Sequence, residues 1–373
     1  MQRAPFPRSA IIFAALLAAC GAPPPAPGPH EDGGDPPDAS VPAAADGGTA
    51  APDGGSAQDA GVPPDGGRPT DGGTASDAGV QDAGVPDAGE LDAGTPVRFV
   101  ALGDTGKANA DQYAVAAAME QKCQQAGCDF AVLLGDNIYP SGVGSANDPL
   151  FQSHFEQPYA NLDFPFFVVL GNHDYGANGA GTNAWQGPYE VQYTQNSTKW
   201  RMPAEYYRFT FGNVDFFATD TNMAMFSSVS AQRSALKGWL QQSTATWKIS
   251  LGHHPYKSNG EHGNAGDYDN LSWLPIASGE NVKDFFEDVL CGKVDLALSG
   301  HDHSRQWLDV RCAGTELAVS GAGASVTTLK NNNPALFAKA TVGFLWVEVT
   351  GNTLRAEFID TAGNVEFSRT LTK

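Results

Sequence analysis

The chain has 373 residues and a formal net charge of −20 at pH 7, from 42 acidic and 22 basic side chains. Residues 21–96 contain 14 of the acidic side chains and 1 basic one, so most of the net charge lies there. The overall acidity therefore says little about any active site, and this composition excludes about a quarter of the chain from a hydrophobic core.

The first 20 residues have the pattern of an export signal. Arg3 and Arg8 precede a short apolar run, Ile11–Ala19, which cannot span a bilayer core of about 30 Å. The ending Leu17-Ala18-Ala19-Cys20 resembles a bacterial lipobox, in which the cysteine is lipidated and becomes the new N-terminus. We therefore expect an exported protein, anchored through Cys20 to the bacterial cell envelope at the outer membrane or cell surface. A plain cleaved signal with an incidental cysteine is the alternative.

Residues 21–96 consist almost wholly of alanine, glycine, proline and aspartate, with irregular repeats such as Asp82–Gly89. Such a segment cannot bury a core and is predicted to be a disordered tether. A Gly-rich coil of this length would average roughly 50 Å from end to end. The predicted organisation is a signal over 1–20, a tether over 21–96 and one folded domain over 97–373.

Apolar, strand-like runs in the folded domain each lead into a loop. They are Val97–Leu102, Phe130–Leu134, Phe166–Leu170, Trp247–Leu251 and Val294–Ser299. Helix-like stretches lie between them at Ala110–Gln125, Ser230–Gln242 and Asn281–Leu290. This alternation of strands and helices indicates α/β layering.

Other segments indicate antiparallel pairing. Tyr206–Phe211 and Val214–Thr219 flank Gly212-Asn213, a two-residue hairpin signal. The C-terminal runs predict a meander of three strands, Gly343–Thr350, Thr353–Asp360 and Val365–Leu371. Residues Trp185–Arg201 are polar and aromatic without clear periodicity, and we interpret them as an excursion near the site. One domain with mixed sheets fits this pattern better than two domains.

The four cysteines beyond Cys20 predict disulfide bonds. Their spacing offers no paired CxxC elements, so a four-cysteine zinc site is the weaker alternative, and disulfides suit an exported protein. Among the possible connectivities we favour the one that is local in sequence, Cys123–Cys128 with Cys291–Cys312.

The loops after the five apolar runs carry seven side chains that can bind metal. The loops are Gly103-Asp104-Thr105-Gly106, Gly135-Asp136-Asn137-Ile138-Tyr139, Gly171-Asn172-His173-Asp174, Gly252-His253-His254-Pro255 and Gly300-His301-Asp302-His303. Each is a weak signal alone, since a Gly-Asp turn is usually only a turn. An open α/β sheet gathers such loops at the carboxyl ends of its strands, so together they predict a two-metal hydrolase site.

The ordered set Gly-Asp-x-Gly, Gly-Asp-x-x-Tyr, Gly-Asn-His-Asp, Gly-His-x-Pro and Gly-His-x-His resembles the purple acid phosphatases, within the calcineurin-like metallophosphoesterases. The small, tartrate-resistant type is the most similar. The similarity runs from Arg98 through the Gly321-Ala322-Gly323 turn. It implies an α/β fold with mixed α+β character, a four-layer αββα sandwich of two mixed β-sheets flanked by helices.

The resemblance implies a binuclear Fe(III)-M(II) centre and, position by position, its ligands. Those of the ferric ion are Asp104, Asp136, Tyr139 and His303, and those of a divalent Fe, Zn or Mn are Asp136, Asn172, His253 and His301, so that Asp136 bridges the ions.

Two positions of the motifs depart from the wider superfamily. Most relatives have a metal-binding histidine where this chain has Gly106, and they lack Tyr139. A phenolate is a hard anionic ligand that suits Fe(III). The family often has another aromatic or polar residue at the position of His254. Since the residue directly after the glycine carries the family's ligand role, we interpret His254 as a neighbour of the ligand His253.

The remaining site residues are implied to act on the substrate. His173 is expected to face the phosphate, oriented by a carboxylate–imidazole pairing with Asp174. His262, in Glu261-His262-Gly263, lies in a Gly- and Asn-rich loop and is expected to protonate the leaving group or to bind phosphate. A solvated loop histidine is the alternative for His262.

The implied function is an acid phosphatase that hydrolyses phosphate monoesters with a metal-bound hydroxide as nucleophile. We expect a small-molecule phosphate ester as substrate, no nucleic-acid partner, a monomer, and contact with the membrane through lipidated Cys20. A phosphodiesterase or nucleotide pyrophosphatase on the same metal centre is the alternative. Redox chemistry at the iron pair and a non-enzymatic surface phosphate-binding protein are two others.

Overall fold

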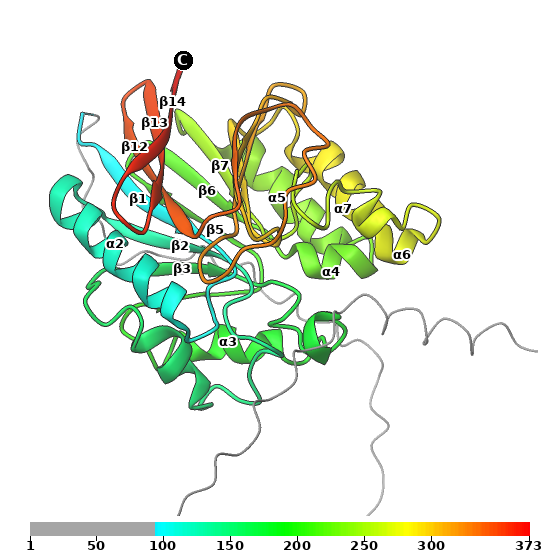
Figure 1. Ribbon diagram of the computed structural model, residues 1–373. Helices are drawn as coiled ribbons and strands as arrows, with labels where there is room; N and C mark the ends of the chain where they lie inside the picture. Colours follow the sequence, from blue (N-terminus) through cyan, green and yellow to red (C-terminus); the bar gives the residue numbers. More distant parts are fainter. Residues whose placement is uncertain (1–93) are drawn as a thin grey trace, which may run out of the picture. The chain divides into compact units, whose positions relative to one another are not determined.

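The computed structural model describes residues 94–373, so the predicted signal, Cys20 and nearly all of the predicted tether lie outside the described residues. The described part contains two seven-stranded sheets with helices on their outer faces (Figure 1). No helix in it is long and apolar enough to cross a membrane.

The first sheet has the strand order β14-β13-β12-β1-β2-β3-β4. Its strands are β1 (Val97–Leu102), β2 (Phe130–Leu134), β3 (Phe166–Val169), β4 (Trp200–Arg201), β12 (Gly343–Thr350), β13 (Thr353–Asp360) and β14 (Val365–Thr372). Neighbours from β1 to β4 are parallel, and β1 pairs with β12 antiparallel. Strands β12, β13 and β14 form the predicted meander.

The second sheet has the order β11-β9-β10-β8-β7-β6-β5. Its strands are β5 (Tyr207–Phe211), β6 (Val214–Ala218), β7 (Trp247–Leu251), β8 (Leu296–Ser299), β9 (Arg305–Leu308), β10 (Glu316–Ser320) and β11 (Ala335–Lys339). Strands β6, β7, β8 and β10 are parallel to their neighbours in this run, and β5 and β6 form the predicted hairpin.

Helices connect the strands or lie in the loops that follow them. They are α2 (Ala110–Ala126), α3 (Gly187–Tyr193), α4 (Thr221–Phe226), α5 (Ser230–Gln242), α6 (Pro275–Ser278) and α7 (Glu280–Phe285), with single helical turns at Gln152–Glu156, Ala177–Gly179, Tyr268–Asn270 and Phe286–Leu290. Helix α2 begins where it does because the side chain of Asn109 accepts a hydrogen bond from the backbone N–H of Gln112 at 2.9 Å.

The two sheets pack face to face through aromatic rings. The rings of Phe99 in β1 and Phe216 in β6 lie 5.3 Å apart, edge to face, and those of Phe167 in β3 and Phe209 in β5 stack at 3.8 Å. All four rings are buried. Burial of such large side chains is the main stabilising term of a sandwich core.

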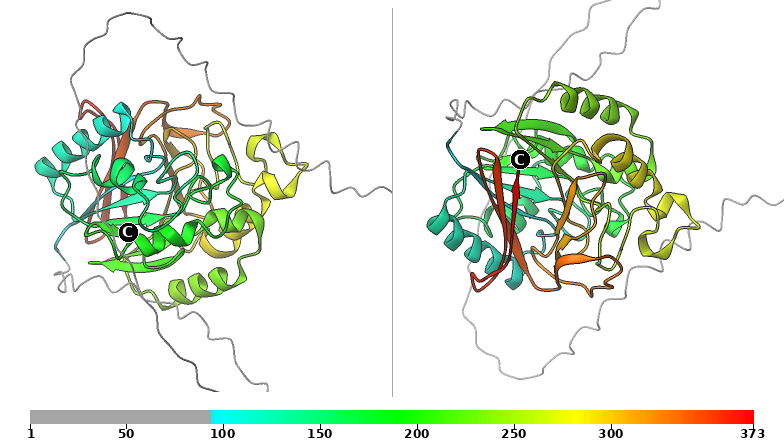
Figure 2. Two further views of the ribbon diagram at one scale, coloured as in Figure 1. Left: turned by 90° about the horizontal axis from the view of Figure 1, so that it is seen from below. Right: turned by 90° about the horizontal axis from the view of Figure 1, so that it is seen from above.

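Helices complete the outer layers, as the views in Figure 2 show. On the first sheet, Lys122 of α2 lies 4.1 Å above the Trp346 ring of β12. On the second sheet, Phe217 points away from the sheet interface into an apolar cluster with Trp239 of α5 and Phe285 of α7. The predicted four-layer αββα sandwich is therefore confirmed.

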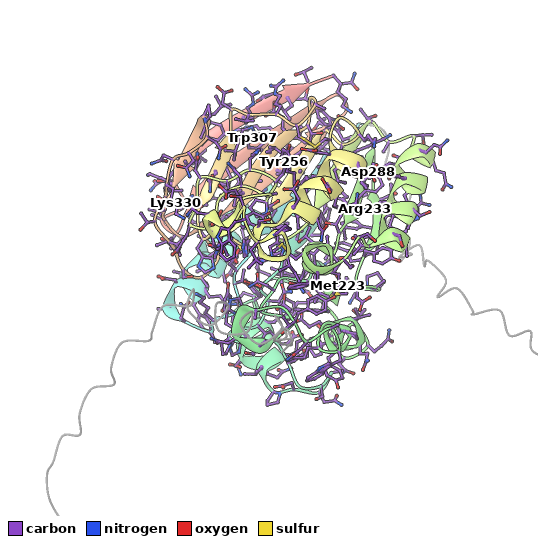
Figure 3. All side chains as sticks on the ribbon, turned by 90° about the vertical axis from the view of Figure 1, so that its right-hand side faces the viewer. Met223, Arg233, Tyr256, Asp288, Trp307 and Lys330 are labelled. Carbon is purple, nitrogen blue, oxygen red and sulfur yellow. A yellow bond between two sulfur atoms is a disulfide. The ribbon has the colours of Figure 1, made fainter. Side chains whose placement is uncertain are left out.

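Surface contacts tie the outer helices together. Arg233 of α5, labelled with Asp288 in Figure 3, donates to the Asp288 carboxylate at 3.1 Å. Lys237 donates to the same carboxylate at 2.7 Å. Exposed pairs of this kind contribute little stability each.

Both predicted disulfides are confirmed. Cys123–Cys128 links the last turn of α2 to the residues after it, and Cys291–Cys312 links two loops, each with a Cα–Cα distance of 5.0 Å. Since these four sulfur atoms are paired, the alternative zinc site has no thiolates.

Candidate metal centre

The loops after β1, β2, β3, β7 and β8 meet where the two sheets adjoin. Within the first sheet, the N–H of Asp104 donates to the Gly135 carbonyl at 2.9 Å. Between the sheets, the N–H of His301 donates to Oδ2 of Asp104 at 2.8 Å. The convergence predicted from the strand–loop pattern is present.

Gly106 allows the first two loops to lie against each other. A Cβ at this position would be 1.8 Å from the carbonyl oxygen of Asn137 and 2.5 Å from the nitrogen of Ile138. The N–H of Tyr139 donates to the Gly106 carbonyl at 2.8 Å. The second loop thus fills the space that a histidine would need at Gly106, and it brings the Tyr139 phenol into the centre instead.

One group of candidate ligand atoms surrounds the phenol oxygen of Tyr139. This oxygen lies 2.9 Å from Oδ2 of Asp136, 3.2 Å from Oδ1 of Asp104 and 3.0 Å from Nε2 of His303. These are the four residues predicted for the ferric ion, and the structure brings them together.

A second group surrounds Nε2 of His253. This nitrogen lies 2.9 Å from Oδ1 of Asn172, 3.1 Å from Nδ1 of His301 and 3.4 Å from Oδ1 of Asp136. These are the residues predicted for the divalent ion. Asp136 therefore directs one oxygen toward each group, which is the arrangement that a bridging carboxylate requires.

The spacing and chemistry of both groups fit metal ions. Ligand atoms that bind an ion at about 2.1 Å in perpendicular directions lie about 3 Å apart, close to the separations here. Asp104, Asp136 and His253 are all buried, and one ligand atom from each lies within 4.8 Å of the others. Two buried carboxylates among imidazoles, an amide and a phenol form a donor set for cations.

Outer hydrogen bonds orient three of the candidate ligands. The Leu134 carbonyl lies 2.8 Å from Nδ1 of His253, and a carbonyl only accepts, so the proton is on Nδ1 and Nε2 is free for a metal. Similarly, Nδ2 of Asn172 donates to the Gly179 carbonyl at 2.8 Å, which directs Oδ1 inward. Nδ1 of His303 pairs with Oγ of Ser325 at 2.9 Å, which turns Nε2 to the centre.

The backbone at three candidate ligands is in the left-handed region. Asp104, Asp136 and His301 have φ values of 60°, 54° and 69°. Residues other than glycine adopt this conformation at a cost and chiefly where the surroundings enforce it, often at functional sites.

The electrostatics of the two groups also favour cations. Burial lowers the pKa of His253, but the charge and hydrogen bond of Asp136, the charge of Asp104 and the hydrogen bond to Leu134 together outweigh burial and raise that pKa to about 9. Burial and then the carboxylates of Asp136 and Asp104 raise the pKa of Tyr139 well above its usual value. The phenol therefore keeps its proton unless a strong Lewis acid binds its oxygen.

Asp174 does not orient His173, so the predicted pairing is wrong. Its Oδ1 accepts from the N–H groups of Asn137 at 2.8 Å and Ile138 at 3.1 Å, and its Oδ2 accepts from the N–H of Gly171 at 2.8 Å. Burial raises the pKa of this carboxyl. Asp174 is thus a buried residue whose carboxylate links the backbones of the second and third loops.

His173 is oriented by a backbone carbonyl instead. Its Nδ1 lies 2.7 Å from the Pro140 oxygen, so Nδ1 carries a proton and Nε2 points toward Asp136, 3.9 Å from Oδ2. The ring packs against Tyr139 with centroids 4.2 Å apart. His173 borders the metal ligands without joining either group.

A carboxylate–imidazole pair was predicted at His173 but is present at His262, where the carboxylate is that of Asp269. Nδ1 of His262 lies 2.9 Å from Oδ1 of Asp269, and the His262 ring stacks on His301 with centroids 4.2 Å apart. Burial opposes the charged ring, but Asp269 and Asp302 outweigh it and raise the pKa of His262 to about 9. The sequence analysis missed Asp269, because a seven-residue separation in an irregular loop carries no periodic signal.

His254 is a neighbour of the centre, as predicted. Its Nδ1 pairs with Oγ1 of Thr221 at 3.0 Å, and its buried ring lies 4.5 Å from the His301 ring. The ring contact places His254 next to the candidate ligand His301.

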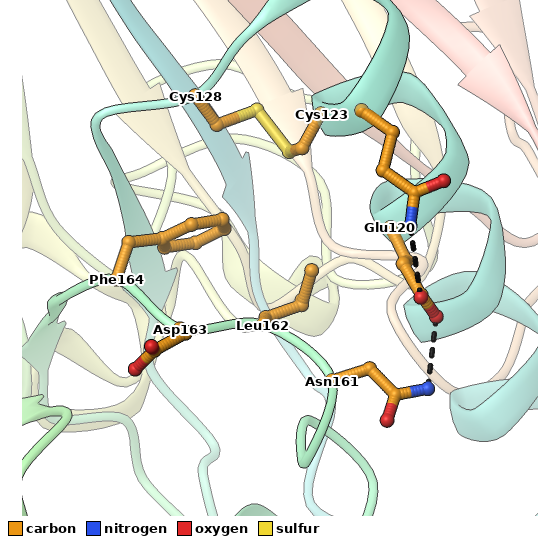
Figure 4. A pocket seen from close by; sticks show the side chains of 8 residues that line it. Glu120, Cys123, Cys128, Asn161, Leu162, Asp163 and Phe164 are labelled. Atoms are coloured by element: carbon orange, nitrogen blue, oxygen red, sulfur yellow. Dashed lines mark hydrogen bonds between the residues drawn. A yellow bond between two sulfur atoms is a disulfide. The ribbon is translucent and has the colours of Figure 1, made fainter.

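A surface pocket of about 210 Å³ lies elsewhere, beside the Cys123–Cys128 disulfide (Figure 4). Glu120 lies on its wall, where its two oxygens accept from Gln124 and Asn161 at 3.0 Å each. None of its lining residues belongs to the candidate centre.

Comparisons with known proteins show what the chain is similar to. The family model of calcineurin-like phosphoesterases matches residues 97–305. Purple acid phosphatase 4 of Arabidopsis thaliana is 30% identical over 298 residues, which cover 72% of this chain and 81% of that protein. Tartrate-resistant acid phosphatase type 5 of Sus scrofa is 29% identical over 319 residues, covering 74% and 87%.

A solved structure shares the fold. GAP50, described as the anchor in the inner membrane complex of Plasmodium, matches with a TM-score of 0.59 and 24% identity over 74% of this chain and 89% of that one. At this identity the similarity concerns the fold alone.

Proposed function

The chain belongs to the calcineurin-like phosphoesterases and, within them, to the purple acid phosphatases, and on that premise we propose that it hydrolyses phosphate monoesters at an Fe(III)-M(II) centre. The observation that carries the proposal is the position of the Tyr139 phenol oxygen. It lies within 3.2 Å of atoms of Asp104, Asp136 and His303, all of which suit a hard ferric ion.

When bound, the two ions neutralise the charge of the substrate phosphate, align it and acidify a water molecule as nucleophile. The protein residues hold the donors in place. Asp136 links the two groups, while Leu134 and Gly179 fix His253 and Asn172 through their carbonyl oxygens. Because these contacts exist before substrate binds, little reorganisation is needed during the reaction.

His173 is suited to bind the phosphate. Its Nδ1 is held by the Pro140 carbonyl, so Nε2 is the nitrogen presented on the side of Asp136. Its side chain is 23% exposed, which leaves it accessible to a ligand.

His262 is suited to protonate the leaving oxygen. Asp269 binds its Nδ1 and stabilises the protonated ring, which leaves Nε2 as the nitrogen able to give a proton. Its stacking on His301 places it next to the second group of ligands. The solvated-loop alternative is less consistent with these two contacts.

The deciding experiment combines metal analysis, a visible absorption spectrum and turnover of two substrates. We expect iron together with a second metal, a tyrosinate-to-iron absorption band, and faster hydrolysis of nitrophenyl phosphate than of bis(nitrophenyl) phosphate. Tyr139→Phe should retain both metals and lose the band. A colourless protein with only divalent ions would refute the ferric assignment, and a preference for the diester would favour the phosphodiesterase alternative.

We also propose that the protein is exported and anchored through lipidated Cys20, which lies outside the described residues. The support is the sequence Leu17-Ala18-Ala19-Cys20 alone. Cys20→Ser should release the protein from membranes while phosphatase activity is unchanged. Equal retention of the variant in the membrane fraction would contradict the anchor.

A further inference from the structure

Lys107 contacts one candidate ferric ligand directly and is linked to a second through a hydroxyl group. Its Nζ lies 4.4 Å from the centroid of the Tyr139 ring. The same ammonium donates to Oγ of Ser325 at 2.8 Å, and this oxygen pairs with Nδ1 of His303 at 2.9 Å. One positive charge therefore reaches Tyr139 through the ring face and His303 through a hydroxyl.

The segment that carries Lys107 is held in place. Its backbone N–H donates to the Thr105 carbonyl at 2.8 Å and to Oε1 of Gln112 at 3.2 Å. Gln112 is fully buried in the first turns of α2 and also accepts from the N–H of Ala108 at 2.7 Å. Gln112 thus fixes the loop to the helix, and the Gly106 carbonyl, which accepts from the N–H of Tyr139, joins the loop to the second motif.

The partner Ser325 is tethered to the same place. The side chain of Asn109 donates to the Ala324 carbonyl at 2.9 Å, which joins the segment before Ser325 to the start of α2. Burial lowers the pKa of Lys107, and the negative charges of Asp104 and Asp136 oppose this change. The contacts therefore describe a built arrangement of a half-buried lysine among carboxylates.

We propose that Lys107 tunes the ferric site, by placing its ammonium charge over the Tyr139 phenolate and by orienting His303 through Ser325. This inference rests on the Fe(III) assignment of the proposed function. A cation above an aromatic ring is attracted to it, and more strongly when the ring carries an anionic oxygen.

The charge has two expected consequences. Because the ammonium lies over the Tyr139 ring itself, its charge would act mainly on the electrons of the phenolate, which would be the donor in a charge-transfer band. The band should therefore lie at shorter wavelength with Lys107 than without it. A nearby positive charge also favours the less positive Fe(II), so it should raise the Fe(III)/Fe(II) potential.

The test compares three variants and one control variant by band position, potential and metal content. Lys107→Met keeps the side-chain stem and removes the charge, so we expect both metals to remain, the band to move to longer wavelength and the potential to fall. Lys107→Arg keeps the charge, so its band position and its potential should lie close to those of the unmodified protein. Ser325→Ala leaves the ammonium over the ring but breaks the link to His303, so its shift should be smaller.

The matched control is Lys122→Met, because Lys122 also lies over an aromatic ring, 4.1 Å from the centroid of Trp346, but outside the centre. It should leave the band and the potential unchanged.

The outcomes separate this inference from the function on which it rests. Absence of any visible band in the unmodified protein would refute the ferric assignment itself. A band that is present but unmoved in Lys107→Met would overturn the tuning role alone. An unmoved band with a raised KM would assign Lys107 to substrate binding and also overturn the proposal. If Lys107→Met loses iron, the band positions of Lys107→Arg and Ser325→Ala decide whether Lys107 tunes the site. An unmoved band in Ser325→Ala would contradict the link to His303.

Discussion

Nδ1 of His262 lies 2.9 Å from Oδ1 of Asp269, and the backbone N–H of Asp269 donates to the His262 carbonyl at 2.9 Å. Two hydrogen bonds thus close the loop between these residues, one through side chains and one through the backbone. The imidazole is held with Nδ1 inside the loop and its face on His301. The pair can act as a positioned proton donor because its orientation does not depend on substrate.

Removing His262 should affect substrates according to their leaving groups. A general acid contributes about 10²–10⁴-fold, and its loss matters most when the leaving oxygen needs a proton. His262→Ala should reduce turnover of an alkyl phosphate by roughly this factor and that of nitrophenyl phosphate much less. Asp269→Asn should reduce the turnover of both substrates in the same pattern, by a smaller factor. Steady-state kcat for both substrates, with metal analysis, measures this.

The control is Asp267→Asn, two residues before Asp269, where Oδ1 accepts from the N–H of Ser272 at 3.1 Å. It should leave the ratio of the two substrates unchanged. Equal losses on both substrates in His262→Ala would leave His262 as a phosphate contact, and no loss would restore the solvated-loop alternative.

Asp136→Asn should remove metal as well as activity. Asp136 is the residue with an oxygen facing each group of donors, and a neutral amide leaves two nearby cations with less compensating charge. We expect metal per protein to fall for both ions, in contrast to Tyr139→Phe. Full occupancy of both sites in purified Asp136→Asn would show that Asp136 is not the bridge. Asp269→Asn, outside both groups, is the control for metal content.

Gly106→Ala should disturb the centre through the backbone. The new methyl group would require Asn137 and Ile138 to move, and such overpacking costs about 1–3 kcal/mol. We expect a lower Tm and weaker visible absorption, because Tyr139 moves with that loop. Gly238→Ala is the control, since no atom lies within 4 Å of its Cβ position in α5, and it should stabilise by about 0.5–1 kcal/mol. Unchanged absorption in Gly106→Ala would contradict this account of the glycine.

Asp220 should make the fold more stable in acid. Burial raises the pKa of Asp220 to about 7, although Tyr175 donates to its Oδ2 at 2.6 Å and the N–H of Met223 donates to its Oδ1. In the unfolded chain the pKa is about 3.9, so between these values the folded state binds the proton more tightly. The contribution of Asp220 to the free energy of unfolding is greatest below about pH 4. It declines as the pH rises to 7, by at most about 4 kcal/mol.

Asp220→Asn removes this titration and retains an oxygen for the helix cap. The urea midpoint of the variant should therefore fall less between pH 4 and 7 than that of the unmodified protein. Asp288→Asn, on the surface, serves as control. Parallel curves for Asp220→Asn and the unmodified protein would show that Asp220 titrates normally.

Much of the fold could be predicted because its signals are local. Buried apolar runs such as Phe130–Leu134 and the helix that begins after Asn109 have their predicted bounds to within a residue or two. The short strands β4, β9, β10 and β11 were not predicted. Strand β4 has only two residues, Trp200 and Arg201, and is a strand only because it pairs with Phe166 and Phe167. The residues of such a segment carry no pattern that predicts a pairing strand elsewhere in the chain.

The sequence by itself determined which side chains are available to bind metal, because strand ends and short motifs encode them locally and the family resemblance assigns them. Tertiary structure alone decided the partners around them. Asp174 is adjacent to His173 in the chain but is turned to the backbone of the second loop, whereas Asp269, which itself has a φ of 56°, lies in a loop that folds back onto His262. A hydrogen bond depends on the distance and direction between two atoms in space, and sequence separation specifies neither.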